Sequence, residues 1–459
     1  MLSAQALHAI WSLAGLPGSA LHQADLRGVD PVFPSSFAVG AAAQATLAAA
    51  GLAACELAHA RGAARRVVSV DLRDAAIEST GWFTLDGKDP DFWDPVSGLY
   101  RCLDGHVRIH ANFAHHRDGA LRVLGLDPAL ATRADVERLL GAWRALDFES
   151  ACADRGLVVT ALRSFEQWDA TEQGRAVAAQ ALMSLTRIGD APARALPPAT
   201  DRAPPLAGLR VLDLTRILAG PVAGRTLAAL GADVLLLNGP HLPNISAIAE
   251  TSRGKRSAQL DLRAAEGRER LWDLIDQAHV FSQGYRPGGL AARGFSPEAL
   301  AARRPGIVYV SLTAYGTQGP WAQRRGFDSL VQTAMGFNHA EGIAAGASQP
   351  RPLPMQILDQ ASGFLMAFGA AAALWRQQQE GGSWHVQVSL AQTAHWLRQL
   401  GRIEGGLDAE RPDLAPYLDC AASGFGRLCA VRPALRIDGE RLAYALASMP
   451  PGSAPPRWD

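Results

Sequence analysis

The sequence predicts an α/β protein in which a doubly wound parallel sheet is joined to a smaller α+β domain. Three observations predict this fold. From residue 208 onward, short apolar segments alternate with amphipathic ones, as in βαβ units. Between about residues 93 and 168, an alternating pattern surrounds an Asp-Gly turn, which indicates a β-hairpin. A Pro-rich stretch at 190–205 separates the two patterns and is typical of an extended linker.

The second half of the chain carries the βαβ units. Segments such as Val234-Leu-Leu-Leu237 are apolar at every position, which is typical of strands buried on both faces of a parallel sheet. The sequence therefore predicts a Rossmann-like domain. In chain order its expected elements are strand 210–214, a turn at Gly220-Pro221, helix 222–230, strand 234–237, helix 264–277, strand 279–282, helix 297–303 and strand 307–312.

The first half begins with a long Ala-rich helix, expected over 41–60, and a strand at 66–72. A hairpin over 100–110 and amphipathic stretches at 131–145 and 147–156 then indicate a small α+β domain. The expected organisation is an N-terminal helix-strand segment (1–80), the small domain (81–189), the linker (190–207), the Rossmann-like domain (208–400) and a C-terminal tail (401–459).

An internal repeat links the two halves. The segment 40–76 parallels the segment 359–394, because each has a long small-residue helix followed by a strand. Placing Val70 opposite Val388 puts Ala41 opposite Asp359, and a one-residue gap would put Gly40 there instead. In either alignment the first copy lacks the carboxylate. The alternative is that two Ala-rich helices followed by strands look alike by composition alone.

Composition excludes several classes of function. The chain has 459 residues, 48% of them apolar, which is enough for a large core. Its 44 basic and 44 acidic residues create no overall field for nucleic acid or an anionic membrane, so neither is expected as a partner. The five cysteines form no CxxC pair and show no zinc-like spacing, so no metal site is expected. Their sparse, odd number suits a cytoplasmic protein. A secretory signal has Lys or Arg before its apolar stretch, and here neither precedes the first apolar stretch, so a secretory signal is not expected.

Asp359 is the candidate catalytic residue. It follows Met355-Gln-Ile-Leu358 at the start of a long small-residue helix. Taken alone, an Asp at a helix start is typical of an N-cap, because its carboxylate accepts hydrogen bonds from the free amides of the first turn. The choice between a cap and a nucleophile therefore depends on the motifs that precede it.

Those motifs occur in a fixed order. They are Leu212-Asp-Leu-Thr-Arg-x-x-Ala-Gly-Pro221, Arg253-Gly-Lys-Arg-Ser257, Tyr285-Arg-Pro-Gly288, Val308-Tyr-Val-Ser-Leu312, Gly326-Phe-Asp328 and Asp359. Across 208–397 this order resembles the class III CoA-transferase family of the CaiB/BaiF type, with its formyl-CoA transferase, carnitine CoA-transferase and 2-methylacyl-CoA racemase relatives. The segment 93–168 resembles the small domain of that family. In the family this domain follows the catalytic aspartate, so the domain order here looks circularly permuted.

The resemblance implies a function and a set of site residues. Asp359 would be the nucleophile that carries an acyl group and then CoA, with no permanently bound cofactor and no metal. The substrates would be an acyl-CoA and a carboxylic acid acceptor, and the protein would be a homodimer. Lys255 and Arg256 would hold CoA phosphates, the amides of Ala219 and Gly220 would form an anion site, and Tyr285 would lie beside the adenine. The full CoA-binding set implied is Leu218, Ala219, Gly220, Lys255, Arg256, Tyr285, Arg286, Arg293, Thr313, Ala314 and Tyr315.

The chain also departs from the family pattern. Ala314 replaces a glycine that is common in the loop after its strand, and a methyl group there would crowd the thioester. Phe327 stands where racemases of the family carry a histidine, and a phenyl ring cannot transfer a proton. Racemisation is therefore disfavoured. The His115-His116 pair lacks metal-ligand spacing and is expected at the surface or at the edge of the core.

Three functions compete. The first is an acyl-CoA:carboxylate CoA-transferase with Asp359 as nucleophile. The second is a catalytically inactive CoA-binding or assembly protein, suggested by the permuted order and by the first copy that lacks the carboxylate. The third, an NAD-dependent dehydrogenase, is disfavoured because the turn at 218–224 does not read GxGxxG.

Overall fold

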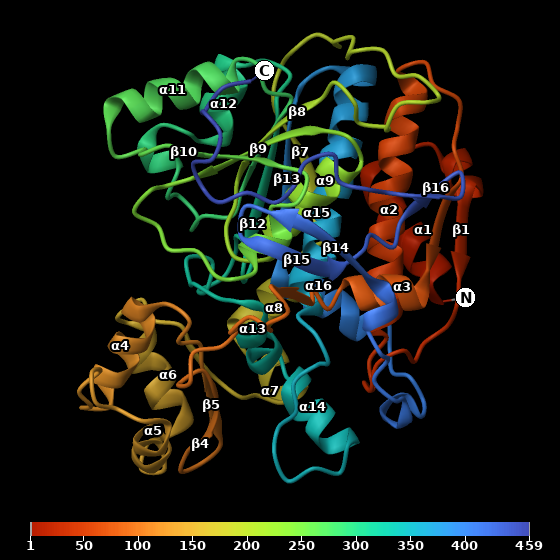
Figure 1. The fold of residues 1–459 in the computed structure, drawn as a ribbon. Helices are drawn as coiled ribbons and strands as arrows, with labels where there is room; N and C mark the ends of the chain where they lie inside the picture. The colour runs from red at the N-terminus through yellow and green to blue at the C-terminus, as the bar shows by residue number, and fades with distance from the viewer. Residues whose placement is uncertain (1, 459) are drawn as a thin grey trace.

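The computed structural model describes residues 2–458, and its largest element within this range is a seven-stranded sheet (Figure 1). The strand order is β10-β9-β8-β11-β12-β13-β7, in which all neighbours are parallel except β13 and β7. The strands are β8 (Arg210–Leu214), β9 (Asp233–Asn238), β10 (Arg256–Gln259), β11 (Val280–Gln283), β12 (Val308–Thr313), β13 (Ser383–Ser389) and β7 (Met183–Gly189). The expected parallel α/β sheet is confirmed.

Helices cover both faces of this sheet, as the apolar strands require. In β8, Val211 faces the core shared with α9 (Ala219–Ala229) and α15 (Ile357–Glu380). Its neighbour Leu212 faces the opposite core, which is shared with α11 (Ala265–Ile275) and α12 (Pro297–Arg303). The remaining helices of this region are α10 (Ile248–Thr251), η2 (Ala291–Arg293), α13 (Asp328–Ala334), α14 (Phe337–Ala344) and α16 (Leu390–Gln399).

One boundary in this domain differs from the expectation. The helix expected over 222–230 begins at Ala219, so Gly220 and Pro221 belong to its first turn. Proline fits there because the first amides of a helix have no intrahelical acceptor to lose. The earlier start matters because it brings the first amides of α9 toward the carboxyl end of the sheet.

The small domain forms a separate core (Figure 1, orange and gold at the lower left). Its three-stranded sheet is antiparallel throughout, and the hairpin expected over 100–110 is confirmed. The elements are β4 (Gly98–Arg101), β5 (His106–Ile109), β6 (Val159–Ala161), α4 (Ala114–Val123), α5 (Arg133–Leu140) and α6 (Ala145–Ala153). After β6, α7 (Phe165–Asp169) and α8 (Glu172–Ala178) lead back to the large sheet. The predicted small domain, 81–189, therefore extends too far, because β7 is an edge strand of the seven-stranded sheet.

The N-terminal segment packs directly on the α/β domain and shares its core. Its elements are α1 (Leu2–Ala14), η1 (Gly18–Gln23), β1 (Ala24–Arg27), α2 (Val39–Ala60), β2 (Val68–Asp71) and α3 (Leu72–Glu78). Helices α2 and α15 are long and apolar enough to cross a membrane, but 100% and 94% of their most apolar windows are buried inside the protein. Burial on all sides is typical of central core helices.

The internal repeat extends beyond composition to topology. The order α2, β2, α3 corresponds to α15, β13, α16. Val70 pairs in parallel with Leu26 of β1, and Val388 pairs in parallel with Leu312 of β12. On the other side, β2 and β13 each have an antiparallel neighbour, β16 (Arg436–Ile437) and β7. Matching pairing on both sides supports a duplication.

The C-terminal tail crosses both repeats, as the long blue segment in Figure 1 shows. Strand β16 continues the sheet of the first repeat, followed by β17 (Glu440–Arg441). Before it, β14 (Leu418–Ser423) and β15 (Gly426–Val431) form a hairpin that pairs with β3 (Phe83–Leu85). The tail also contains the short turns η3 (Gly406–Asp408) and η4 (Ala415–Tyr417). Near its end, the Trp458 indole donates to the Leu274 carbonyl at 3.0 Å, so the tail also packs on the α/β domain.

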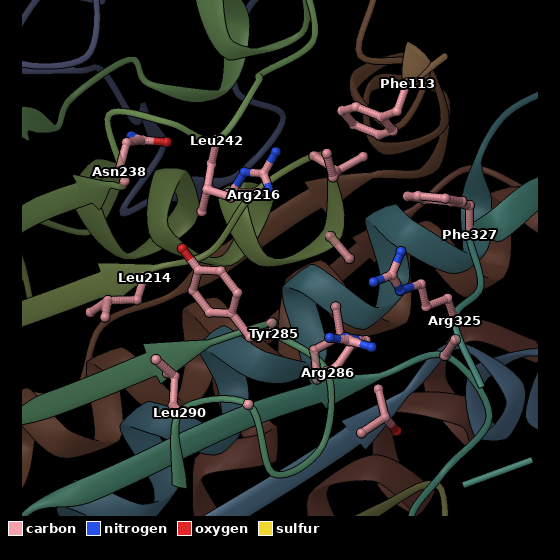
Figure 2. Close-up of a pocket in the computed structure, with 18 of the residues that line it drawn as sticks. Phe113, Leu214, Arg216, Asn238, Leu242, Tyr285, Arg286, Leu290, Arg325 and Phe327 are labelled. Atoms are coloured by element: carbon pink, nitrogen blue, oxygen red, sulfur yellow. The ribbon is translucent and has the colours of Figure 1, made fainter. Parts of the chain in front are cut away.

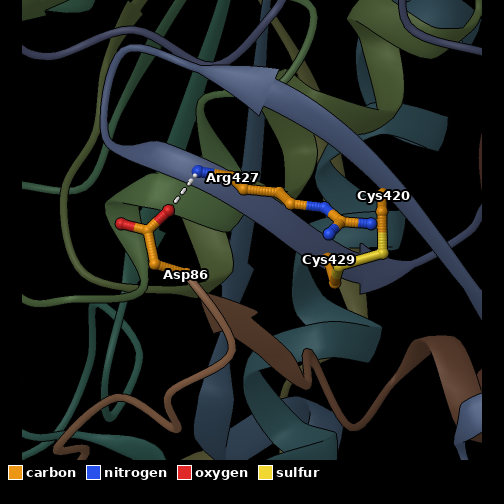
Figure 3. The surroundings of a disulfide bond; sticks show 4 residues. All are labelled: Asp86, Cys420, Arg427 and Cys429. Atoms are coloured by element: carbon orange, nitrogen blue, oxygen red, sulfur yellow. Dashed lines mark hydrogen bonds between the residues drawn. A yellow bond between two sulfur atoms is a disulfide. The ribbon is translucent and has the colours of Figure 1, made fainter.

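A disulfide that the sequence did not predict joins Cys420 and Cys429 across this hairpin (Figure 3). Next to the turn of this hairpin, the Arg427 amide in β15 donates to the Asp86 carboxylate at 2.8 Å. Cys55, Cys102 and Cys152 are free and buried.

Candidate active site

A cavity of about 510 Å³ opens at the carboxyl ends of the parallel strands (Figure 2). One wall comes from the segments that follow β8, β9, β11 and β12, where ligands bind in open α/β sheets. The opposite wall comes from the small domain, through Phe113, His115 and His116 at the start of α4. The cavity therefore lies between the two domains, and both belong to the same chain.

Asp359 lies in this cavity because two helices approach each other closely. It is the third residue of α15, and it lines the cavity. One turn later, Gly363 faces the first turn of α9, where a Cβ atom would lie 2.6 Å from the Ala219 carbonyl oxygen. Because glycine has no Cβ, α9 approaches closely, and the Ala219 amide faces the Asp359 carboxylate and favours its ionised form.

The backbone just before α9 is strained. Ile217 has a φ angle of +79°, which is unfavourable for a β-branched residue. It lines the cavity together with Leu218 and Ala219. Such outliers concentrate at functional sites, where the surrounding structure holds them in place. Here the strained turn sets the direction of the first amides of α9.

Asp359 is not the N-cap of its helix. The cap position is Gln356, whose side chain makes no capping hydrogen bond. Asp328, at the start of α13, instead accepts the Asp359 amide at 2.9 Å and also the Leu358 amide. The Gln332 side chain donates to the other oxygen of Asp328 at 2.5 Å. The Asp359 side chain is therefore not needed for capping and faces the cavity.

The two carboxyl groups perturb each other. Asp328 is 1% exposed, and burial raises its pKa to about 7 despite its three hydrogen-bond donors. Burial and the neighbouring Asp328 charge raise the pKa of Asp359 well above its usual range, while the Ala219 amide opposes the rise. Two like charges cannot ionise independently at such close range, so the pair titrates as a unit. A paired, shifted carboxylate in a cavity is a candidate catalytic group.

The first repeat preserves the cap without the nucleophile. At the start of α2, Asp30 accepts the Gly40 amide at 3.2 Å and the Ala41 amide at 2.8 Å. These two amides correspond to those of Leu358 and Asp359, which Asp328 accepts. The correspondence selects the alignment in which Ala41 stands opposite Asp359. Both repeats therefore have a capping aspartate, Asp30 in the first and Asp328 in the second. Only the second repeat has a further aspartate, Asp359, which lines the cavity.

Arginines dominate the charge of the cavity. Arg216, Arg286 and Arg325 point into it from three loops (Figure 2). Within residues 2–458, none of the three has a carboxylate partner within 4 Å. Arg216 donates to the Pro243 carbonyl instead. The cluster is therefore suited to an anionic ligand with more than one charge.

The structure brings most of the expected CoA-binding residues together. Those that line the cavity with Asp359 are Leu218, Ala219, Tyr285, Arg286, Arg293, Thr313 and Ala314. Two others do not reach it. Gly220 packs against Thr215, where a Cβ would lie 2.3 Å from that side chain's Cβ. Tyr315 is 2% exposed and packs edge-on against Trp321.

The expected phosphate ligands lie elsewhere. The Lys255 ammonium is buried and donates to Asp213 and to the Pro221 carbonyl, both at 2.8 Å. This pair fits beneath α9 because Gly224 leaves room, since a Cβ there would lie 2.1 Å from an Asp213 oxygen. Arg256 forms an ion pair with Asp233 at 2.8 Å. The placement of Lys255 and Arg256 outside the cavity corrects their expected role in phosphate binding.

Sequence reasoning missed the wall from the small domain. His116 is 4% exposed and lines the cavity, and its Nε2 atom lies 3.4 Å from the Arg325 guanidinium. Burial lowers its pKa to about 3, so the ring is neutral. The expected surface or core-edge position of the histidine pair is thus corrected for His116, whereas His115 is exposed at the rim. The sequence offered two signals for this wall, the adjacent Phe113 and the expected hairpin. Neither indicates that this part of the small domain faces the α/β domain.

The composition of the site gives no indication of a metal centre. No group of three or more His, Cys, Asp or Glu side chains with metal-binding geometry occurs among residues 2–458. The polar side chains of the cavity are arginines, histidines, one carboxylate and the uncharged Asn238, Tyr285 and Thr313.

Comparison with known proteins is consistent with this geometry. The family model of CoA-transferase family III matches residues 206–402. An acyl-CoA transferase of Gibberella moniliformis is 32% identical over 325 residues, covering 68% of this chain and 54% of that protein. A succinate–glutarate CoA-transferase of Agrobacterium fabrum is 32% identical over 244 residues, covering 47% of this chain and 60% of that protein. The crystal structure of Rv3272 from Mycobacterium tuberculosis is 35% identical, with a TM-score of 0.40, over 43% of this chain and 56% of that one.

The chain thus spans little more than half the length of these relatives. The matched segment includes the parallel strands, the Ala219 turn and Asp359. The resemblance seen in the motifs is confirmed over this segment, because residues 206–402 match the model of CoA-transferase family III.

Proposed function

We propose that the protein transfers CoA from an acyl-CoA to a carboxylic acid, with Asp359 as the covalent carrier. The single observation that carries the proposal is the position of this carboxylate. It lines a cavity between two domains and faces the Ala219 amide. The same cavity contains the cluster of Arg216, Arg286 and Arg325, which have no carboxylate partner among the described residues. Relatives named as acyl-CoA and succinate–glutarate CoA-transferases support the reaction class. A homodimer and a cytoplasmic location remain part of the proposal.

The reaction divides into balanced exchanges. The Asp359 carboxylate attacks the thioester carbonyl, which forms a mixed anhydride and releases the CoA thiolate. The thiolate attacks the Asp359 carbonyl carbon, which forms an aspartyl-CoA thioester and releases the donor acid. The acceptor carboxylate then attacks that thioester and forms a second anhydride. The released thiolate attacks the acceptor carbonyl, which yields the new acyl-CoA and the free Asp359 carboxylate.

The Ala219 amide supplies the electrostatic stabilisation in this scheme. It faces the Asp359 carboxylate and favours its charged form, so it is placed to donate to the oxyanion that develops when a thiolate or carboxylate attacks the aspartyl carbonyl. The amides of α15 cannot do this. The Asp359 amide donates to Asp328 and the Gln360 amide donates to the Gln356 carbonyl. We therefore assign the oxyanion donor to α9 and not to the helix that carries Asp359.

The raised pKa values give the site a protonation requirement. Asp359 attacks only as a carboxylate, and Asp328 raises its pKa through like charge. A carboxylate with a raised pKa is also more basic and more nucleophilic once ionised. The arginine cluster would bind the phosphates of the acyl-CoA and so hold its thioester near Asp359. Activity is therefore expected to increase as pH rises through the titration of the pair.

Intact-protein mass spectrometry tests the proposal. The protein is incubated with a panel of acyl-CoA thioesters, and half of each sample is treated with hydroxylamine. An acyl-sized or CoA-sized adduct that hydroxylamine removes is expected with the native protein and with Asp154→Asn, whose exposed carboxylate makes no side-chain hydrogen bond in the described chain. The adduct is expected to be absent from Asp359→Asn. CoA binding without any adduct would refute the transferase and support the non-catalytic alternative.

A further inference from the structure

Arg325 occupies a distinctive position among the cavity arginines. It belongs to the segment Arg325-Gly326-Phe327-Asp328, and Asp328 accepts the Asp359 amide at 2.9 Å. Three residues of extended chain span at most about 10 Å, so this segment tethers Arg325 to the Asp359 end of the cavity. Figure 2 shows its guanidinium pointing into the cavity below Phe327. Asp359 and Arg325 nevertheless form no ion pair within the described chain.

The chemistry of CoA gives this cation little to bind. All phosphates of CoA belong to its nucleotide portion, and a long neutral arm separates them from the thioester. Arg216, Arg286 and Arg293 follow β8 and β11 and serve that nucleotide portion best. A cation tethered near the nucleophile faces the acyl group or the acceptor instead.

The surroundings of Arg325 form a built site. His116 is buried and neutral, its Nε2 atom lies 3.4 Å from the Arg325 guanidinium, and its Nδ1 atom has no hydrogen-bond partner in the described chain. By contrast, the adjacent Arg324 is neutralised by Glu149 at 3.5 Å and stacks on Trp321. The Arg325 guanidinium itself is half-buried and has no acidic partner within the described chain, so a bound carboxylate would compensate its partial loss of hydration.

We propose that Arg325 and His116 form a subsite for a second carboxylate, so that the acyl group exchanged at Asp359 comes from a short dicarboxylic acid. One carboxyl group reacts at Asp359 while the other accepts hydrogen bonds from the Arg325 guanidinium. Arg325 and Asp359 line the same cavity and lie more than 4 Å apart within the described chain, as a substrate with a carbon chain between its two carboxyl groups requires. This inference rests on the proposed CoA transfer.

The test compares acids of equal carbon number that differ in one carboxylate. With succinyl-CoA as donor, kcat/KM is measured for glutarate and for pentanoate as acceptors. The native protein is expected to favour glutarate by at least about tenfold, the discrimination typical of a charged hydrogen-bonded contact. Arg325→Gln is expected to remove most of this preference, measured as the ratio of the two kcat/KM values, because the shared succinyl-CoA donor step cancels in that ratio. Arg411→Gln, which replaces an exposed arginine outside the cavity, is the matched control.

A binding measurement separates this inference from the proposed function. Two proteins are compared, Asp359→Asn and the double variant Asp359→Asn/Arg325→Gln. Each is saturated with CoA and titrated in a calorimeter with glutarate and, separately, with pentanoate. Glutarate-selective binding that requires Arg325 supports the subsite even if no acyl exchange occurs. An equal preference for the two acids, or a preference that Arg325→Gln leaves unchanged, overturns it. If Arg325→Gln fails to fold, Arg325→Lys keeps the charge without the two-pronged geometry and is expected to retain a reduced preference.

Discussion

Replacing Asp359 by asparagine is predicted to stabilise the protein while abolishing transfer. The amide side chain has nearly the same shape, and its oxygen can still accept the Ala219 amide. The cap on α15 is unaffected, because Asp328 accepts the backbone amide of residue 359. The substitution therefore removes one negative charge beside Asp328 and little else.

The magnitude follows from the perturbed titration. Burial raises the pKa of Asp328 from 3.8 to about 7, and burial together with the Asp328 charge raises the pKa of Asp359 well above its usual range. Each pKa unit corresponds to about 1.4 kcal/mol. Ionising the pair in the folded protein thus costs a few kcal/mol. Because water reaches Asp359 from the cavity, we expect relief of about 1–2 kcal/mol. That gain corresponds to a rise of a few degrees in the melting temperature.

The pH dependence has a definite sign. A carboxyl group with a raised folded-state pKa keeps its proton where the unfolded chain has lost it, so stability falls as pH rises from about 4 to about 7. The two proteins should melt together at pH 4 and separate progressively up to pH 8. Thermal unfolding followed by circular dichroism at half-unit steps measures this. A constant difference across the range, or a less stable variant at pH 8, would refute the coupling between the two carboxyl groups.

Three further outcomes are expected. Lys255→Met should lower the free energy of unfolding by about 3–5 kcal/mol in chemical denaturation, because it leaves the buried Asp213 unpaired; unchanged stability with weaker CoA binding would restore its phosphate role. Gly224→Ala should be similarly destabilising, because the methyl group would meet that same ion pair. Arg286→Ala should weaken CoA binding about tenfold in calorimetry at low salt and less at high salt, and the opposite salt trend would contradict a phosphate contact.

The sequence was a good guide to the elements of the fold but a weaker one to their partners. Strand and helix periodicities are local, and they predicted the βαβ units and the hairpin of the small domain. The position of β7 depends on a pairing with β13, about two hundred residues away, and no local pattern encodes such a partner. The same limit applies to β16, whose two residues carry no strand pattern of their own.

The candidate site shows a similar division. Motif order identified Asp359, and its neighbours Ala219 and Tyr285 lie in the same cavity. Lys255 was misinterpreted because a lysine in a loop motif is usually solvated, whereas here Asp213 and a glycine gap below α9 bury it. His116 was missed because its role depends on how the small domain packs.

The internal repeat explains why one cavity can be complete within a single chain. After the first repeat, the chain builds the small domain and then returns as β7 to the sheet of the second repeat. After the second repeat, it returns as β16 to the sheet of the first. This exchange of strands fixes the small domain against the cavity that holds Asp359. The first repeat, with Ala41 in the corresponding place, contributes packing but neither a cavity-lining residue nor a nucleophile. The proposed catalytic reaction therefore depends on one helix start, where Asp328 provides the cap and leaves the Asp359 side chain facing the cavity.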